Sequence, residues 1–112
     1  VPPYGTVPPP PVIASGLVRN VNPADYQLAL YINVEGTWWT KPYWDFPLTP
    51  IAPDGTFACR IWTGGIDERA TVITAFLVPV GYTPPLARGH RAIPAEIVRD
   101  AITSTTYNRP RP

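Results

Sequence analysis

The sequence is poor in the residues on which most catalytic and metal-binding sites depend. It contains one cysteine, one histidine and no methionine among 112 residues, and only 15% of its residues are charged. A single cysteine cannot form a disulfide within the chain. The net charge of +1 argues against a nucleic-acid or charged-membrane partner, because both are bound through clusters of Lys and Arg. No apolar run reaches the length of a transmembrane helix.

The few reactive side chains are not arranged for catalysis. His90 stands alone in a loop, with no serine nucleophile motif and no phosphate-binding glycine pattern elsewhere in the sequence. Cys59 alternates with Phe57 and Ile61, which indicates a buried and unreactive thiol. The carboxylates are scattered and lack the spacing of a calcium loop. We therefore expect a protein that is not an enzyme and that holds neither a cofactor nor a metal ion.

Proline, in contrast, is abundant, with 17 residues. Each proline lacks a backbone N–H and clashes inside a helix, so helices must be few. Residues 1–11 and 108–112 are rich in proline and are predicted to be linkers, which leaves a folded domain at 12–107. Because the chain begins at Val1 and lacks methionine, we expect a processed chain or one module of a larger polypeptide.

Between these ends, short apolar stretches with period-two alternation predict strands separated by turns. The predicted strands are 12–21, 26–35, 37–41, 56–63, 70–80 and 101–107, with at most one helical turn near 94–99. The strand at 70–80 is expected to be central because it is long and apolar. Such a series of short strands indicates an all-β fold, an antiparallel β-sandwich of Ig-like or jelly-roll-like type. A small β-barrel is the alternative.

The stretch GTWWTKPYWDFP, residues 36–47, holds three of the four tryptophans. Trp38 and Trp39 are consecutive, so on a strand they cannot both point inward. We expect one of them in the core and the other open to solvent. Pro42 then turns the chain so that Tyr43 or Trp44 can join the open ring.

The fourth tryptophan belongs to another predicted strand. If Phe57, Cys59 and Ile61 face the core, alternation places Trp62 on the outer face beside Arg60. The sequence therefore predicts a row of exposed tryptophans contributed by two strands.

An exposed aromatic row suits a sugar ligand. The axial C–H groups of a pyranose are apolar and weakly positive, and they stack on the negative face of an aromatic ring. A β-linked glucan is a flat ribbon and can meet several rings at once. Lys41, Asp45, Arg60 and Glu35 are the candidates to hydrogen-bond the hydroxyls at the edges of such a ribbon.

Two blocks of the sequence, YINVEGTWWTKPYWDFPLTPIAPDGTF and TGGIDERATVITAFLVP, resemble a family of small β-sandwich carbohydrate-binding modules. The similarity spans roughly residues 16–101, and modules of this family accompany bacterial plant-cell-wall hydrolases, notably endoglucanases. The resemblance implies a secreted, non-catalytic module that is linked to a glycoside hydrolase. It also implies binding of soluble β-glucans, including cello-oligosaccharides, mixed-linkage β-glucan and xyloglucan, on an aromatic platform.

Within the matching blocks, the platform candidates rest on the alternation described above. Trp39, Trp44 and Trp62 rank first, and Trp38 and Tyr43 rank second. The glycine pair of the TGGIDE loop suits turns with positive φ, so we expect that loop to be structural.

Two other functions remain open at the level of the sequence. An aromatic patch could bind proline-rich segments of a protein partner, as small domains with aromatic grooves do. Alternatively, the domain could be an Ig-like structural spacer, in which case all four tryptophans should be largely buried.

Overall fold

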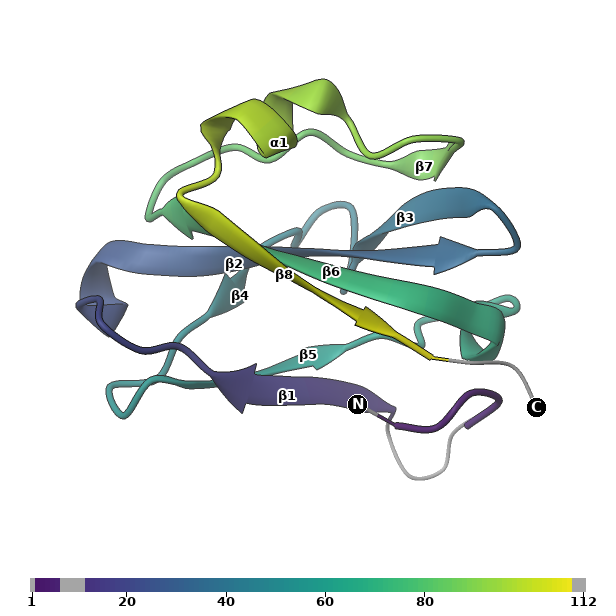
Figure 1. Ribbon diagram of the computed structural model, residues 1–112, viewed down its shortest axis with the longest axis horizontal. Coiled ribbons are helices and arrows are strands. Elements are labelled where there is room, and N and C mark those ends of the chain that lie inside the picture. The colour runs from purple at the N-terminus through teal and green to yellow at the C-terminus, as the bar shows by residue number, and fades with distance from the viewer. Residues whose placement is uncertain (1, 7–11, 110–112) are drawn as a thin grey trace.

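The computed structural model describes residues 2–6 and 12–109 and shows an all-β sandwich, as predicted (Figure 1). The strands are β1 (Ile13–Leu17), β2 (Tyr26–Val34), β3 (Thr37–Lys41), β4 (Thr49–Pro50), β5 (Thr56–Arg60), β6 (Ala70–Pro79), β7 (Arg88–His90) and β8 (Thr103–Asn108). The helices are α1 (Ala95–Asp100) and the short 3-10 turns η1 (Pro23–Asp25) and η2 (Asp67–Arg69). Within the described residues, no helix is long and apolar enough to cross a bilayer.

The larger of the two sheets has six strands in the order β7-β3-β2-β6-β8, with β4 also paired to β2. All of its pairings are antiparallel, and the prediction that the strand at 70–80 is central is confirmed. The β2–β3 connection is a two-residue turn in which Glu35 (φ 50°) and Gly36 (φ 89°) both have positive φ. This is the turn geometry that matches the twist of a hairpin.

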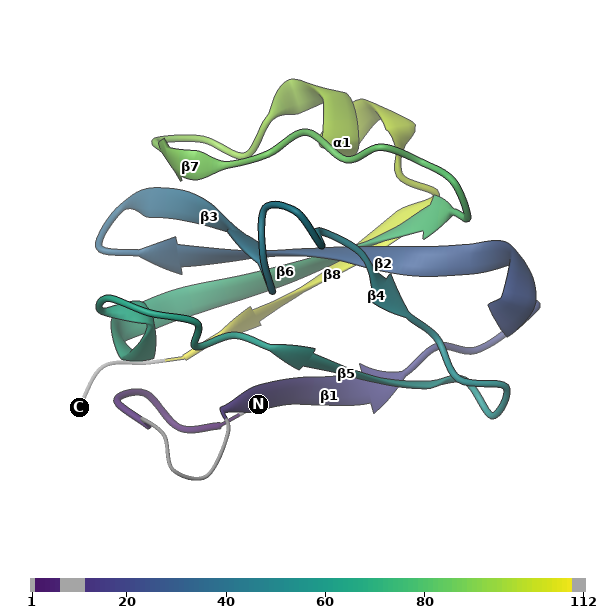
Figure 2. The ribbon, with the colours of Figure 1, turned by 180° about the vertical axis from the view of Figure 1, so that it is seen from behind.

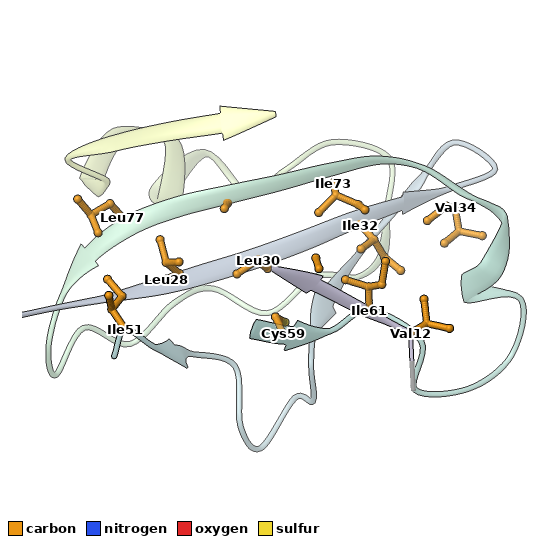
Figure 3. Close-up of a cluster of buried hydrophobic side chains, with 13 residues drawn as sticks. Val12, Leu28, Leu30, Ile32, Val34, Ile51, Cys59, Ile61, Ile73 and Leu77 are labelled. Atoms are coloured by element: carbon orange, nitrogen blue, oxygen red, sulfur yellow. The ribbon is translucent and has the colours of Figure 1, made fainter. Parts of the chain in front are cut away.

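Both faces of the larger sheet are covered, so the domain has two apolar clusters rather than one. On one face, the two-stranded β1–β5 sheet packs over even-numbered residues of β2, including Leu28, Leu30 and Ile32 (Figure 3). On the other face, α1 and the segment that precedes it cover Ala29 and Tyr31. The strict alternation of β2, predicted from the sequence, thus serves two cores at once.

The second cluster contains a polar anchor. The Tyr31 hydroxyl donates to the backbone carbonyl of Pro85 at 2.8 Å, and the Tyr31 ring meets Phe76 edge-on. Burial raises the pKa of the Tyr31 hydroxyl above its ordinary value. This bond ties the segment before α1 to the centre of the sheet, and Figure 2 shows that segment and α1 lying over the larger sheet, on the side away from β1 and β5.

Several predicted boundaries differ from those in the structure. The first strand ends at Leu17 rather than at residue 21: the Val18 N–H makes one last bond to the Gly55 carbonyl, and Asn20 then leaves the extended conformation with a positive φ of 64°. The fourth ends at Arg60 rather than at residue 63. Two short strands, β4 and β7, lie in stretches that were predicted to be loops.

The described parts of the chain ends are packed together. Arg109 is only 2% exposed, and its guanidinium donates to the carbonyls of Ala70, Pro2 and Glu68. Gly5 N–H donates to the same Glu68 carbonyl at 2.8 Å. Asn108 and Arg109 were predicted to belong to a linker, whereas Asn108 lies in β8 and Arg109 is buried. Residues 1, 7–11 and 110–112 of the predicted linkers lie outside the described residues.

Candidate functional site

A groove of about 970 Å³ runs over β3, on the face of the larger sheet that carries the β1–β5 sheet. Thr37, Trp39 and Lys41 alternate along β3, and all three line the groove. They pair with Val34, Ile32 and Leu30 of β2, and paired residues of an antiparallel ladder share a face. Two strands cannot cover a six-stranded sheet, and the groove lies where the smaller sheet leaves β3 uncovered.

The first wall of the groove is a tight turn that follows β3. The chain turns at Pro42, and Tyr43 and Phe46 bridge each other through two backbone hydrogen bonds of 3.4 and 3.1 Å. The turn leaves Tyr43 44%, Trp44 46% and Phe46 57% exposed. Tyr43 and Trp44 line the groove together with Asp45, whereas Phe46 does not.

The edge strand β7 holds the exposed ring of that turn. The Arg88 guanidinium lies over the Trp44 ring, with its central carbon 4.4 Å from the ring centroid. A cation at this distance is attracted by the negative face of the ring. Arg88 also pairs with Trp39 across the β3–β7 ladder. The residue that contacts Trp44 is therefore itself part of the larger sheet.

Trp39 is half-buried and forms part of the floor of the groove. It packs against the inter-sheet cluster, and its indole N–H donates to the Thr37 hydroxyl at 3.0 Å. Gly89 of β7 makes room for the ring, since a Cβ at that position would lie 3.1 Å from the Trp39 ring. Gly89 also has a φ of +83°, which disfavours any side chain there.

The polar part of the floor is a buried ion pair between β3 and the opposite wall. Lys41 Nζ lies 2.5 Å from Asp67 Oδ2 and 2.8 Å from the Thr63 hydroxyl. Asp67 Oδ2 also accepts the Thr63 N–H at 2.9 Å. The opposite wall itself is formed by residues 63–67, where Gly65 adopts a φ of 57°, as predicted for the glycine pair.

Two predictions about the tryptophans are wrong. Neither Trp38 nor Trp39 is open: Trp38 is half-buried against the second cluster, on the face opposite the groove. The prediction assumed that one face of the sheet is bare, whereas both faces are covered. Trp62 does not stand exposed beside Arg60, because β5 ends at Arg60 and the alternation stops there.

Trp62 is instead half-buried against the inter-sheet cluster, and its indole N–H donates to Glu68 at 2.9 Å. Neither Trp62, Trp38 nor Arg60 lines the groove. Six of the predicted site residues do lie together along it, namely Glu35, Trp39, Lys41, Tyr43, Trp44 and Asp45. Trp44 is the one tryptophan of the described chain among the strongly exposed apolar side chains, so the predicted row of exposed tryptophans is reduced to a single fully open ring.

Several residues of the groove were not predicted from the sequence, among them Asp67, Ile66 and Arg88. Asp67 and Ile66 belong to the TGGIDE loop, which was interpreted as structural only. Arg88 lies in a stretch without periodicity, and no local signal places it beside Trp44. The TGGIDE block could have been a signal for Asp67, since an acidic residue in a glycine-rich loop is well placed to partner a lysine.

The groove offers no arrangement of reactive groups. Among residues 2–6 and 12–109, no cluster of three or more His, Cys, Asp or Glu side chains could hold a metal ion. Cys59 lies between the sheets, where burial raises the pKa of its thiol to about 11. The groove offers aromatic faces beside a polar floor.

The fold and the groove define an all-β sandwich with an aromatic-lined groove along its larger sheet. Comparisons of the chain with protein-family models, with curated proteins and with solved structures found no match.

Proposed function

We propose that the chain is a non-catalytic carbohydrate-binding module that holds β-glucans in this groove. The observation that carries the proposal is the grouping of Trp39, Tyr43 and Trp44 around one groove with a polar floor. Aromatic faces bind the apolar faces of pyranose rings, and polar side chains bind the hydroxyls at the ring edges. The ligands proposed are cello-oligosaccharides, mixed-linkage β-glucan and xyloglucan.

The charges around the groove favour a neutral ligand. The buried ion pair of its floor is neutral as a unit, and Glu35 at one end is paired with Arg69 at 3.1 Å. Asp45 and Arg88 have opposite signs, and neither has an ion-pair partner among the described residues. A polyanion would therefore meet no concentrated positive field here.

The rigidity of the aromatic walls supports binding of an extended chain. Each ring contact with a sugar is modest, so affinity depends on several rings that are already in place before binding. Trp39 is fixed by packing and by its bond to Thr37, and Trp44 is fixed by Arg88. The proposal includes the role implied by the resemblance, a secreted bacterial module that brings a linked glycoside hydrolase to its polysaccharide.

The test is isothermal titration calorimetry and affinity electrophoresis against β-glucan, xyloglucan, cellohexaose, xylan and mannan. We expect Trp44→Ala to weaken glucan binding at least tenfold. Phe46→Ala is the matched control, since Phe46 is an exposed aromatic of the same turn that lies outside the groove. It should leave the affinity unchanged. Failure of every glucan to bind the wild-type protein would refute the proposal.

The same experiment separates the alternatives. A proline-rich peptide that shifts the tryptophan fluorescence, where cellohexaose does not, would indicate a protein-interaction module. A spacer domain should bind none of these ligands. The 46% exposure of Trp44 already departs from the spacer reading, which requires all four tryptophans to be largely buried.

A further inference from the structure

The ion pair on the groove floor is more deeply buried than any other ion pair of the described residues. The Lys41 and Asp67 side chains are 6% and 12% exposed, whereas both partners of the other two pairs are at least 33% exposed. Both residues line the groove. A buried ion pair is a weak device for stability, because apolar residues of similar volume often serve as well or better. Its position in a groove therefore calls for a second explanation.

The hydrogen bonds of the pair are incomplete in a specific way. The Lys41 ammonium has three N–H donors, and two of them are used, by the Thr63 hydroxyl and by Asp67 Oδ2. Asp67 Oδ2 accepts from Lys41 Nζ and from the Thr63 N–H and hydroxyl. Within the described chain, the third Lys41 donor and the second Asp67 oxygen, Oδ1, have no protein partner.

The two remaining valences are a donor and an acceptor on paired side chains that both line the groove. A hydroxyl group is the complement of such a pair, since its oxygen accepts one hydrogen bond while its O–H donates another. A backbone carbonyl or a proline-rich peptide could satisfy the lysine only, because it brings no donor for the carboxylate oxygen. A ligand that displaces water from such groups without pairing them loses affinity.

We infer that Lys41 and Asp67 form a subsite on the floor of the groove that binds one hydroxyl group of the ligand. One hydroxyl of the ligand accepts from Lys41 Nζ and donates to Asp67 Oδ1, while the aromatic walls contact the ring. This inference rests on the proposed function and sharpens its ligand class. The ligand is a saccharide that presents a free, unsubstituted hydroxyl at the buried edge, and glucans that carry an ether or another substituent at that hydroxyl are rejected.

The first experiment varies the ligand and leaves the protein intact. Calorimetry compares cellohexaose with per-O-methylated cellohexaose, which keeps the rings but lacks every hydroxyl donor. We expect the wild-type protein to bind the methylated ligand on the order of 100-fold more weakly or worse, since sites built to bond a hydroxyl reject analogues that lack it. Binding of the two ligands within threefold of each other would overturn the inference.

The second experiment assigns the discrimination to the pair. Asp67→Asn removes the charge with little change in shape, and the ratio of the two dissociation constants should fall at least tenfold. Glu96→Gln is the control, because it removes the same charge from an exposed residue of α1 that does not line the groove. It should keep the ratio of the wild-type protein.

The outcomes are distinguishable from a failure of the proposed function. If wild-type protein binds no unmodified glucan, the proposed function itself fails. If Asp67→Asn weakens both ligands equally and the ratio is unchanged, the pair is structural and the inference is wrong. If Asp67→Asn does not fold, as judged by near-ultraviolet circular dichroism, Lys41→Arg is measured instead, because it keeps the charge and should still shift the ratio by changing the donor geometry.

Discussion

Replacing Arg109 with alanine removes the side chain that joins the described ends of the chain to η2 and to the start of β6. Its guanidinium donates to the carbonyls of Ala70 at 3.0 Å, Pro2 at 3.1 Å and Glu68 at 2.8 Å. Ala70 is fully buried, so water cannot replace the lost donor there without opening the structure. The other two carbonyls belong to half-buried residues, where water can partly compensate.

The expected loss of unfolding free energy is about 3 kcal/mol. Leaving the buried Ala70 carbonyl unpaired costs about 2 kcal/mol, and the two partly solvated bonds contribute about 0.5–1 kcal/mol each. The variant also removes a cation whose burial is itself unfavourable, as the lowered pKa of the Arg109 guanidinium shows, so the sum is not larger. With a urea slope of about 1.5 kcal/mol per molar, the midpoint should fall by about 2 M.

Urea unfolding followed by tryptophan fluorescence measures this loss, and amide hydrogen exchange locates it. Exchange should accelerate at Gly5, whose N–H shares the Glu68 carbonyl with Arg109. Arg60→Ala is the control, because Arg60 is exposed and its side chain makes no hydrogen bond within the described residues, so its midpoint should hardly move. If the unfolding free energy of Arg109→Ala lies within 0.5 kcal/mol of the wild-type value, the packed ends do not stabilise the fold and the reasoning fails.

Three further outcomes follow from the burial of individual groups. Trp38→Ala should lower the unfolding free energy by about 2 kcal/mol, which is less than for a core tryptophan because the ring is only half-buried. The glucan affinity measured by calorimetry should be unchanged, because Trp38 lies on the face opposite the groove. Arg88→Ala should leave the urea midpoint unchanged but increase acrylamide quenching of Trp44, and unchanged quenching would contradict the role of the cation–π contact. Burial raises the pKa of Cys59 from 9.0 to about 11, so the unfolded chain ionises first and stability should fall between pH 9 and pH 11 by about 3 kcal/mol. Urea midpoints measured across this range check the slope, which Cys59→Ala should reduce.

Much of the fold was predictable because it is encoded locally. The alternation of β2 is set by the pleat, and its end is set by the Glu35–Gly36 turn, so both appear in the sequence as patterns of a few residues. The same holds for β3 and for the central position of β6, whose apolar run needs cover on both faces. The end of β1 was missed because Asn20 turns the chain with a positive φ of 64°, which the apolar pattern of residues 12–21 does not encode.

The site was predictable only where it follows β3 and its turn. Alternation correctly separates Trp38 from Trp39, but it cannot tell which face of a strand lies under another layer. Here both faces are covered, and β3 is left open on one of them only where the smaller sheet ends. Whether a tryptophan of β3 lies in the core or in the groove therefore depends on how far the β1–β5 sheet extends over the larger sheet.

The same argument explains why Asp67 and Arg88 escaped prediction although they complete the groove. Each is brought to β3 by a long-range contact, Asp67 through its bond to Lys41 and Arg88 through its ladder pair with Trp39. Of the two strands that pair with β3, β2 is fixed by the local hairpin, whereas the position of β7 depends on the topology of the whole sheet. For β3, the strand and its two flanking turns supply the aromatic rings together with Glu35, Lys41 and Asp45, whereas distant elements supply Asp67 and Arg88. The local half of a site built in this way can be predicted from sequence, whereas the half that long-range contacts bring to the strand depends on the fold.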